Sequence, residues 1–401
     1  MKVTNKSEKY FQRSIKAIEL GQYRKAKKWL NIASFYGHPI EQIYFQRGII
    51  SLRLLKLTDA LNFFHLYLSR EHDADNIIYY YLAETYNMMG NSNESIKYYK
   101  MSFEGTTELL IKCKSLLNLE KAFNNSSEAN LQIMRSKLDY FLIANYDKIN
   151  ELRVDACISI IKGNYDIAID ILKNLANKNP NFVDIYKELC ECYLRANLYD
   201  ELIQIIKNNK NIFKRDKSFK IYLAKAYYHT NRLSEAKKEL STILKIVPGN
   251  SKLFFNMANV YYKLNQINSA IKYYTKAIKK DSKFYESYFN LGVLHHKSGL
   301  LNFSQEYYTK AKDLNFKLVP ANYNLGILYY QKKNYFDSLN AFQQALQDNN
   351  DDHRAIHNFN AIKNLKFIDP DINIDKKILS MLNIYLFVIA GILLLLFILF
   401  S

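Results

Sequence analysis

Residues that could bind a metal or act as nucleophiles are few and scattered in this sequence. His353 and His357 in "HRAIH" would share one helix face, which is half of a metal site, but no Glu follows His353 as in the HExxH zinc motif. A solvated terminal helix explains this pair better. Cys190 and Cys192 are too close for zinc-ribbon spacing, and packing explains them better. The chain has no P-loop and no GxGxxG. We therefore expect no enzyme, no metal site and no cofactor.

The composition favours helices as the elements of the fold. The 401 residues are 49% hydrophobic, which is ample for a core, and they include only 11 Gly and 5 Pro. An all-β protein needs many more turn residues. Four Cys give no disulfide framework and indicate a reducing compartment. The net charge of +18 is compatible with nucleic acid, anionic lipid or acidic partners, and also with the codon bias of an AT-rich genome.

Small and apolar residues recur every 34 residues. When the repeats are aligned, one set of equivalent positions lies where the second helix of each unit would pack against the first. Another set lies twelve residues upstream, and we call each set a column. Such a period indicates two helices per unit, which bury their apolar faces only by stacking on their neighbours. The two columns are Ala168, Leu202, Ala236, Ala270, Ser304 and Ser338, and Ala156, Cys190, Ala224, Ala258, Gly292 and Gly326.

The same register divides most of the chain into units. Pro180 and Pro248 follow second helices, where a helix must end. The predicted segments are three units over 7–105, a degenerate helical repeat over 106–148, six contiguous units over 149–352, a capping helix over 353–367 and a linker over 368–377.

The pattern resembles the tetratricopeptide repeat (TPR) family. The segments "FFNMANVYYKLNQINSAIKYYTKAIKKDS" (254–282) and "YFNLGVLHHKSGLLNFSQEYYTKAKDLN" (288–315) are close to its consensus. The resemblance implies an all-α fold, a right-handed α-solenoid of helix-turn-helix (TPR) repeats, to which the sequence adds one C-terminal transmembrane helix. It also implies that the protein binds partners in a concave groove and usually catalyses nothing itself.

In the TPR family the first helix of each unit lines the groove. Asparagines follow this surface in successive units and resemble a row in the repeat superhelix of O-linked N-acetylglucosamine transferase. They would project into solvent in the empty protein and pair with an extended peptide backbone, since an amide both donates and accepts. The alternative is that Asn is simply abundant here. The implied groove residues are Phe255, Asn256, Asn259, Tyr262, Lys263, Phe289, Asn290, His296, Lys297, Tyr323, Asn324 and Tyr330.

The C-terminal segment 378–400 is apolar enough to cross a bilayer. Its 23 residues would form about 34 Å of helix, and a buried core helix is the alternative. Lys363, Lys366, Lys376 and Lys377 flank only its N-terminal side. The positive-inside rule then predicts a single-pass tail anchor with a cytoplasmic repeat domain, in a bacterial inner membrane or an organelle membrane.

Together these features predict a membrane-anchored TPR scaffold that binds an extended segment of a protein partner. The lipid bilayer would contact 378–400, and nucleic acid is not expected as a partner. The alternative function is a basic solenoid that binds nucleic acid or an anionic membrane surface. Salt would separate the two, because binding to a polyanion weakens steeply as salt rises.

Overall fold

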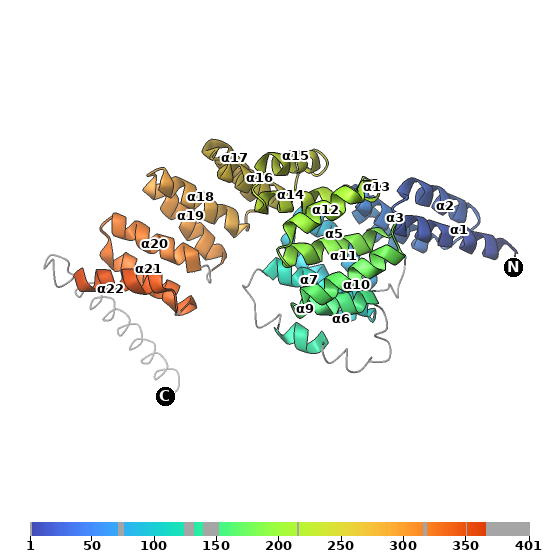
Figure 1. The fold of residues 1–401 in the computed structure, drawn as a ribbon, viewed down its shortest axis with the longest axis horizontal. Coiled ribbons are helices and arrows are strands. Elements are labelled where there is room, and N and C mark those ends of the chain that lie inside the picture. Colours follow the sequence, from blue (N-terminus) through green and yellow to red (C-terminus); the bar gives the residue numbers. More distant parts are fainter. Residues whose placement is uncertain are drawn as a thin grey trace, which may run out of the picture. The chain divides into compact units, whose positions relative to one another are not determined.

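The computed structural model describes residues 2–70, 76–123, 132–138, 152–214, 216–315, 319–349 and 351–365. Over these residues the protein is an all-α helical-repeat solenoid, and no strand occurs within them (Figure 1). The chain divides into two compact units, Met1–Asp281 and a second unit that begins at Ser282.

Consecutive helices pack against each other within each unit. Residues 132–138 are also helical. The helices of the first unit are α1 (Lys2–Glu19), α2 (Tyr23–Phe35), α3 (Ile40–Arg53), α4 (Leu57–Leu68), α5 (Ile77–Met89), α6 (Ser92–Gly105), α7 (Leu109–Phe123), α9 (Leu152–Ile161), α10 (Tyr165–Lys178), α11 (Val183–Arg195), α12 (Tyr199–Asn208), α13 (Lys210–Phe213), α14 (Phe219–His229), α15 (Leu233–Leu244), α16 (Ser251–Lys263) and α17 (Ile267–Lys280). Those of the second are α18 (Tyr285–Lys297), α19 (Leu301–Leu314), α20 (Val319–Gln331), α21 (Tyr335–Asp348) and α22 (His353–Leu365).

Small residues let the two helices of a pair approach closely. In α19 the buried hydroxyl of Ser304 donates to the carbonyl of Gly292 on α18 at 2.9 Å. Ser338 on α21 makes the same bond to Gly326 on α20 at 2.7 Å. A Cβ atom at either glycine would come within 2.7 Å of a buried aromatic ring on the partner helix. The two contacts are 34 residues apart, so one repeat reproduces the packing of the other.

The turns between paired helices also repeat. Asn197, Asn231 and Asn265 adopt φ values of 59°, 59° and 57°, the left-handed region that Asn tolerates better than most residues. Leu55 and Lys333 adopt the same conformation with φ values of 59° and 58°. The turn geometry is therefore a property of the repeat, and it persists where the residue type does not favour it.

The first unit closes on itself between helices that are far apart in sequence. The Asn250 side chain at the start of α16 donates to the carbonyl of Met88 at the end of α5, at 2.6 Å. The Ser251 hydroxyl donates to the carbonyl of Gly90 at 3.3 Å. We call this meeting of residues 87–90 with residues 250–252 the closure contact.

Partly buried ion pairs also connect distant helices of the first unit. Glu188 on α11 lies 2.7 Å from Lys114 Nζ on α7 and 2.5 Å from an Arg153 nitrogen on α9. Arg53 on α3 pairs with Asp184 on α11 at 2.8 Å. These pairs fix the faces of α3, α7 and α9 that are turned toward α11.

Several predicted segments lie outside the described residues. They are the transmembrane helix 378–400, the linker 368–377, the end of the capping helix and most of the second half of the degenerate repeat 106–148. Among the helices that are described, none is both long and apolar enough to span a bilayer.

Candidate functional site

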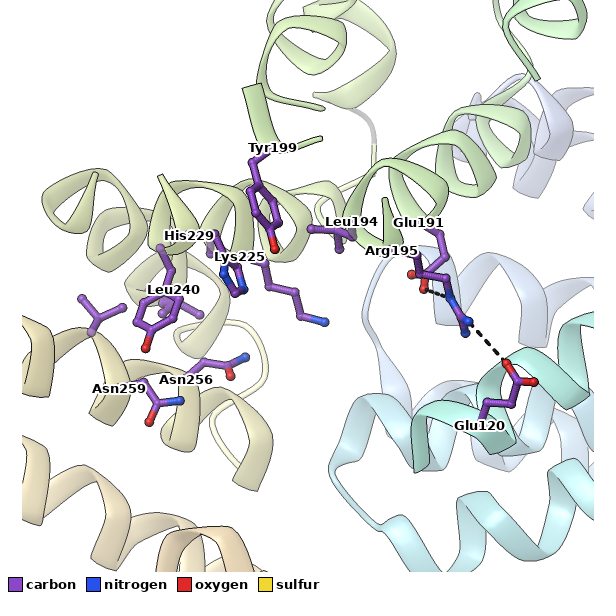
Figure 2. A pocket seen from close by; sticks show the side chains of 13 residues that line it. Glu120, Glu191, Leu194, Arg195, Tyr199, Lys225, His229, Leu240, Asn256 and Asn259 are labelled. Atoms are coloured by element: carbon purple, nitrogen blue, oxygen red, sulfur yellow. Dashed lines mark hydrogen bonds and ion pairs between the residues drawn. The ribbon is translucent and has the colours of Figure 1, made fainter. Parts of the chain in front are cut away.

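A cavity of about 540 Å³ in the first unit brings together side chains from α7, α11, α12, α14, α15 and α16. Figure 2 shows Asn256 and Asn259 of α16 on one side of it and Glu120 of α7 on the opposite side. Both asparagines were predicted as groove residues from the sequence. The predicted groove residues of α16 therefore face side chains from earlier helices of the first unit across this cavity.

An arginine orders the acidic side of the cavity. Arg195 Nε donates to Glu191 at 3.1 Å, and its terminal nitrogens donate to Glu120 at 3.3 Å and to the carbonyl of Leu117 at 3.0 Å. Arg135 also pairs with Glu120 at 2.8 Å. Both carboxylates therefore have cationic partners, and this wall is held in place without a ligand (Figure 2).

The opposite wall is aromatic and basic. His229 stacks on Tyr199 with ring centroids 4.5 Å apart and planes 3° apart. Burial, together with the charges of Lys263 and Lys225, holds the pKa of His229 below its usual range. This imidazole is neutral at pH 7 and offers a ring face and a nitrogen to a ligand. Lys263 lies 4.0 Å from the centroid of the Tyr228 ring.

One of the two α16 amides at the cavity is already engaged within the protein. Asn259 accepts a hydrogen bond from the Tyr274 hydroxyl at 2.5 Å, and Asn256 is half-buried at the cavity wall. The Asn259 side chain is therefore held against the second helix of its own repeat.

Other predicted groove residues of α16 lie beside the cavity. Phe255 packs on Tyr274 with ring centroids 5.7 Å apart, and Tyr262 is half-buried. Lys263 is exposed and donates to the carbonyl of Tyr228 at 3.3 Å.

In the second unit, the predicted residues of α18 are partly used in packing. The Phe289 ring contacts the buried ring of Tyr308, with centroids 5.7 Å apart. Asn290 is half-buried and Lys297 is exposed. His296 Nε2 lies 2.8 Å from the side-chain oxygen of Gln331. The α18 side chains are thus tied to α19 and α20.

The predicted residues of α20 divide between two environments. Asn324 donates to the Tyr308 hydroxyl at 3.3 Å, and Tyr323 accepts from Asn358 at 3.2 Å. Asn324 was expected to project into solvent, but its amide is held by the buried Tyr308. Tyr330 is 47% exposed and lines a separate cavity of about 370 Å³ formed by α20, α21 and α22.

Sequence reasoning missed the cavity residues of the two preceding repeats. Glu191, Lys225 and Asn259 are spaced by 34 residues, and all three line the cavity. Arg195, His229 and Lys263 are also spaced by 34 residues, and the first two of them line the cavity. The register itself was the signal that could have found them, but their residue types change from repeat to repeat.

The residues first considered for catalysis or metal binding have other surroundings. Cys190 and Cys192 are buried, and burial raises the pKa of Cys192 to about 12, so this thiol is not ionised at pH 7. His353 and His357 are exposed on α22. Within the described ranges, no group of three or more His, Cys, Asp or Glu residues is arranged to hold a metal ion.

Comparison with protein families identifies the repeats. A model described as "TPR repeat" matches residues 258–299, and two models described as "Tetratricopeptide repeat" match residues 285–318 and 319–352. Residues 258–352 are therefore tetratricopeptide repeats, as the sequence predicted. A comparison with curated proteins finds no match.

Three solved structures are among those to which this chain is similar. YrrB, described as a TPR protein with an unusual peptide-binding site, is 19% identical over 46% of this chain and 96% of its own, with a TM-score of 0.37. A MamA double mutant is 14% identical over 41% and 92%, with a TM-score of 0.38. The Cut9–Hcn1 hetero-tetramer of APC/C is 15% identical over 92% and 79%, with a TM-score of 0.45.

Proposed function

We propose that this protein is a membrane-anchored scaffold, without catalysis of its own, that binds a segment of a partner protein in the cavity and recruits it to the bilayer. Its TPRs belong to a repeat class that mediates protein–protein interactions. Stacked repeats of this kind bind through the continuous surface formed by their first helices.

The cavity is the observation that carries the proposal. Three consecutive repeats contribute side chains to it from equivalent positions, and these combine amides, aromatic rings and cations. The Asn256 amide suits the carbonyls of a peptide backbone, while Tyr199, Tyr228 and His229 suit its side chains. A volume of about 540 Å³ lies in the range of small-ligand sites, so a short segment fits better than a long one.

A double substitution in the cavity tests peptide binding. We expect Asn256→Ala with Lys225→Ala to weaken a peptide selected from a display library against the full chain. Each polar contact is worth about 0.5–1.5 kcal/mol, so the loss should be roughly 5- to 150-fold in Kd, measured by fluorescence anisotropy.

The matched control places the same changes outside the cavity. Asn268 and Lys272 are exposed on α17, so Asn268→Ala with Lys272→Ala removes one amide and one amine there. The selected peptide should bind this variant as it binds the wild type. Equal weakening by both variants would contradict the proposed site.

The anchoring part of the proposal rests on the apolar segment 378–400. Deleting residues 378–401 should move the protein from the membrane fraction to the soluble fraction, while its helical circular dichroism persists. The fractions should be separated at about 0.5 M salt, where the Debye length is only a few ångströms and attraction between exposed charges is screened. A truncated chain that stayed with the membrane under these conditions would show that the tail is not the anchor.

A further inference from the structure

The first helix pair carries a concentrated positive charge. Residues 1–37 contain nine Lys or Arg and two Glu. Eight of the cations are exposed on α1 and α2: Lys6, Lys9, Arg13, Lys16, Arg24, Lys25, Lys27 and Lys28. The positive charge therefore lies on a folded helical surface. The two Glu are too few to neutralise the nine cations.

Aromatic rings form a ladder within this charge. Tyr10 of α1 stacks on Trp29 of α2, with centroids 5.5 Å and planes 15° apart, and on Tyr36, with centroids 5.8 Å and planes 9° apart. Lys6, Tyr10 and Arg13 share one face of α1 because they are spaced at i, i+4 and i+7. We call these residues, with Lys28 and Phe35, the basic aromatic surface.

The ladder rings already have stacking or cationic partners. Both Trp29 and Tyr36 stack on Tyr10, and the Arg13 guanidinium lies 5.3 Å from the Trp29 centroid. Lys28 Nζ lies 5.9 Å from the centroid of the Trp29 ring, and Lys6 Nζ lies 5.6 Å from the centroid of the Tyr36 ring. Stacking of nucleic-acid bases requires open ring faces. In the ladder these rings are engaged by one another and by cations, and exposed Lys and Arg side chains surround them.

One apolar side chain stands clear of the surface. Phe35 at the end of α2 is 84% exposed, and its ring meets Tyr36 edge-on with centroids 5.4 Å apart. A bilayer interface accommodates three kinds of side chain found here. Tyr and Trp rings lie at the level of the lipid head groups, Lys and Arg reach anionic lipids, and a protruding apolar ring can enter the head-group layer.

We propose that the basic aromatic surface of α1 and α2 docks on a bilayer that contains anionic lipid. Its cations contact the lipid phosphates and carboxylates, and the Phe35 ring enters the head-group layer. This contact is separate from the cavity and from the tail. It would hold the first repeats against the membrane, because the cations of the surface are attracted to the negative head groups of anionic lipids such as phosphatidylserine.

Trp29 makes the proposal directly measurable, because it is the single tryptophan in the chain. The full chain is mixed with vesicles of phosphatidylcholine, or with vesicles that also contain phosphatidylserine and a brominated lipid. We expect a blue shift and bromolipid quenching of Trp29 only with the anionic vesicles, and both should disappear at high salt. Flotation of the same samples reports total attachment, including any through the tail, so failure of the tail and failure of this surface give different results.

Charge reversal supplies the variants. Lys6→Glu with Arg13→Glu and Lys28→Glu reverses the exposed cations of the basic aromatic surface and should abolish the Trp29 shift. The control, Lys238→Glu with Lys272→Glu and Lys279→Glu, changes the net charge equally at exposed positions on α15 and α17, and it should retain the shift.

Three results would overturn the proposal. An equal Trp29 shift on neutral and anionic vesicles would mean that charge does not drive the contact. Loss of the shift in the control variant would assign it to net charge alone. Quenching of Trp29 by single-stranded oligonucleotide without lipid, together with no response to anionic vesicles, would assign the surface to nucleic acid.

Discussion

Replacing Glu188 with Gln is expected to lower the free energy of unfolding by about 3–5 kcal/mol, the usual cost of breaking a buried ion pair from one side. Glu188 is 9% exposed and accepts hydrogen bonds from Arg153 at 3.1 and 2.5 Å. Lys114 Nζ lies 2.7 Å away. The substitution removes the carboxylate that the two half-buried cations share where α7, α9 and α11 meet. Urea unfolding of the full chain, followed by circular dichroism, measures the loss.

The effect should depend on pH in a defined direction. Burial alone would raise the pKa of Glu188, but Lys114 and Arg153 outweigh it and hold the pKa below its ordinary value of 4.5. A carboxyl group with a depressed folded pKa contributes stability above its unfolded pKa and loses it as pH falls through the folded pKa. The difference between wild type and Glu188→Gln should therefore be full at neutral pH and shrink as pH falls below about 4.5.

An exposed ion pair provides the control. Glu94 lies 3.8 Å from Lys97 on α6, and the side chains are 38% and 60% exposed. Glu94→Gln should cost at most about 1 kcal/mol, since solvent screens such pairs. If both substitutions cost the same, the buried network does not hold α7, α9 and α11 together.

Contacts within one repeat were accessible from the sequence because they are local and periodic. The 34-residue columns predicted that Ser304 and Gly292 belong to packing positions, and these residues meet through a hydrogen bond of 2.9 Å. The turn residues Asn231 and Asn265 are 34 residues apart as well, and they adopt φ values of 59° and 57°. Each such contact joins residues less than one repeat apart, so a pattern of residue types reveals it.

Contacts between distant repeats left no such pattern. Arg53 meets Asp184, and Asn250 meets Met88, because small rotations between successive repeats accumulate until separated helices face each other. The cavity is similar in this respect. Asn259 was predicted from its groove position on the first helix of a TPR, whereas Glu191 and Lys225 occupy the same column in earlier repeats with different chemistry and were missed.

The closure contact is the distant contact most open to a precise test. Gly90 adopts φ +82° at the end of α5, and a Cβ atom there would lie 2.9 Å from the backbone nitrogen of Ser251. Gly163 adopts φ +81° at the end of the equivalent helix α9, where a Cβ atom would meet nothing within 4 Å. Both glycines therefore need a left-handed backbone, but only a side chain at Gly90 would collide with α16.

We expect Gly163→Ala to cost about 1–2 kcal/mol for a left-handed alanine, and Gly90→Ala to cost roughly 1–3 kcal/mol more. The additional cost arises because α16 must move away from α5 and lose its hydrogen bonds to Met88 and Gly90. Urea unfolding measures the totals. Hydrogen exchange should locate the added loss of protection in residues 250–256 for Gly90→Ala alone.

A change at Asn250 separates the closure contact from the start of α16. Asn250 Oδ1 accepts from the Leu253 backbone nitrogen at 2.9 Å and caps the helix, while Nδ2 donates to Met88. Asn250→Asp keeps the cap, since Asp serves equally well there, but replaces the donor by an oxygen that faces a carbonyl. We expect it to expose residues 87–90 and 250–256 to exchange as Gly90→Ala does, and to weaken peptide binding at Asn256 by loosening α16. Full protection of both segments in Asn250→Asp would mean that the closure contact does not hold α5 and α16 together, and that the cavity wall is fixed by neighbouring repeats alone.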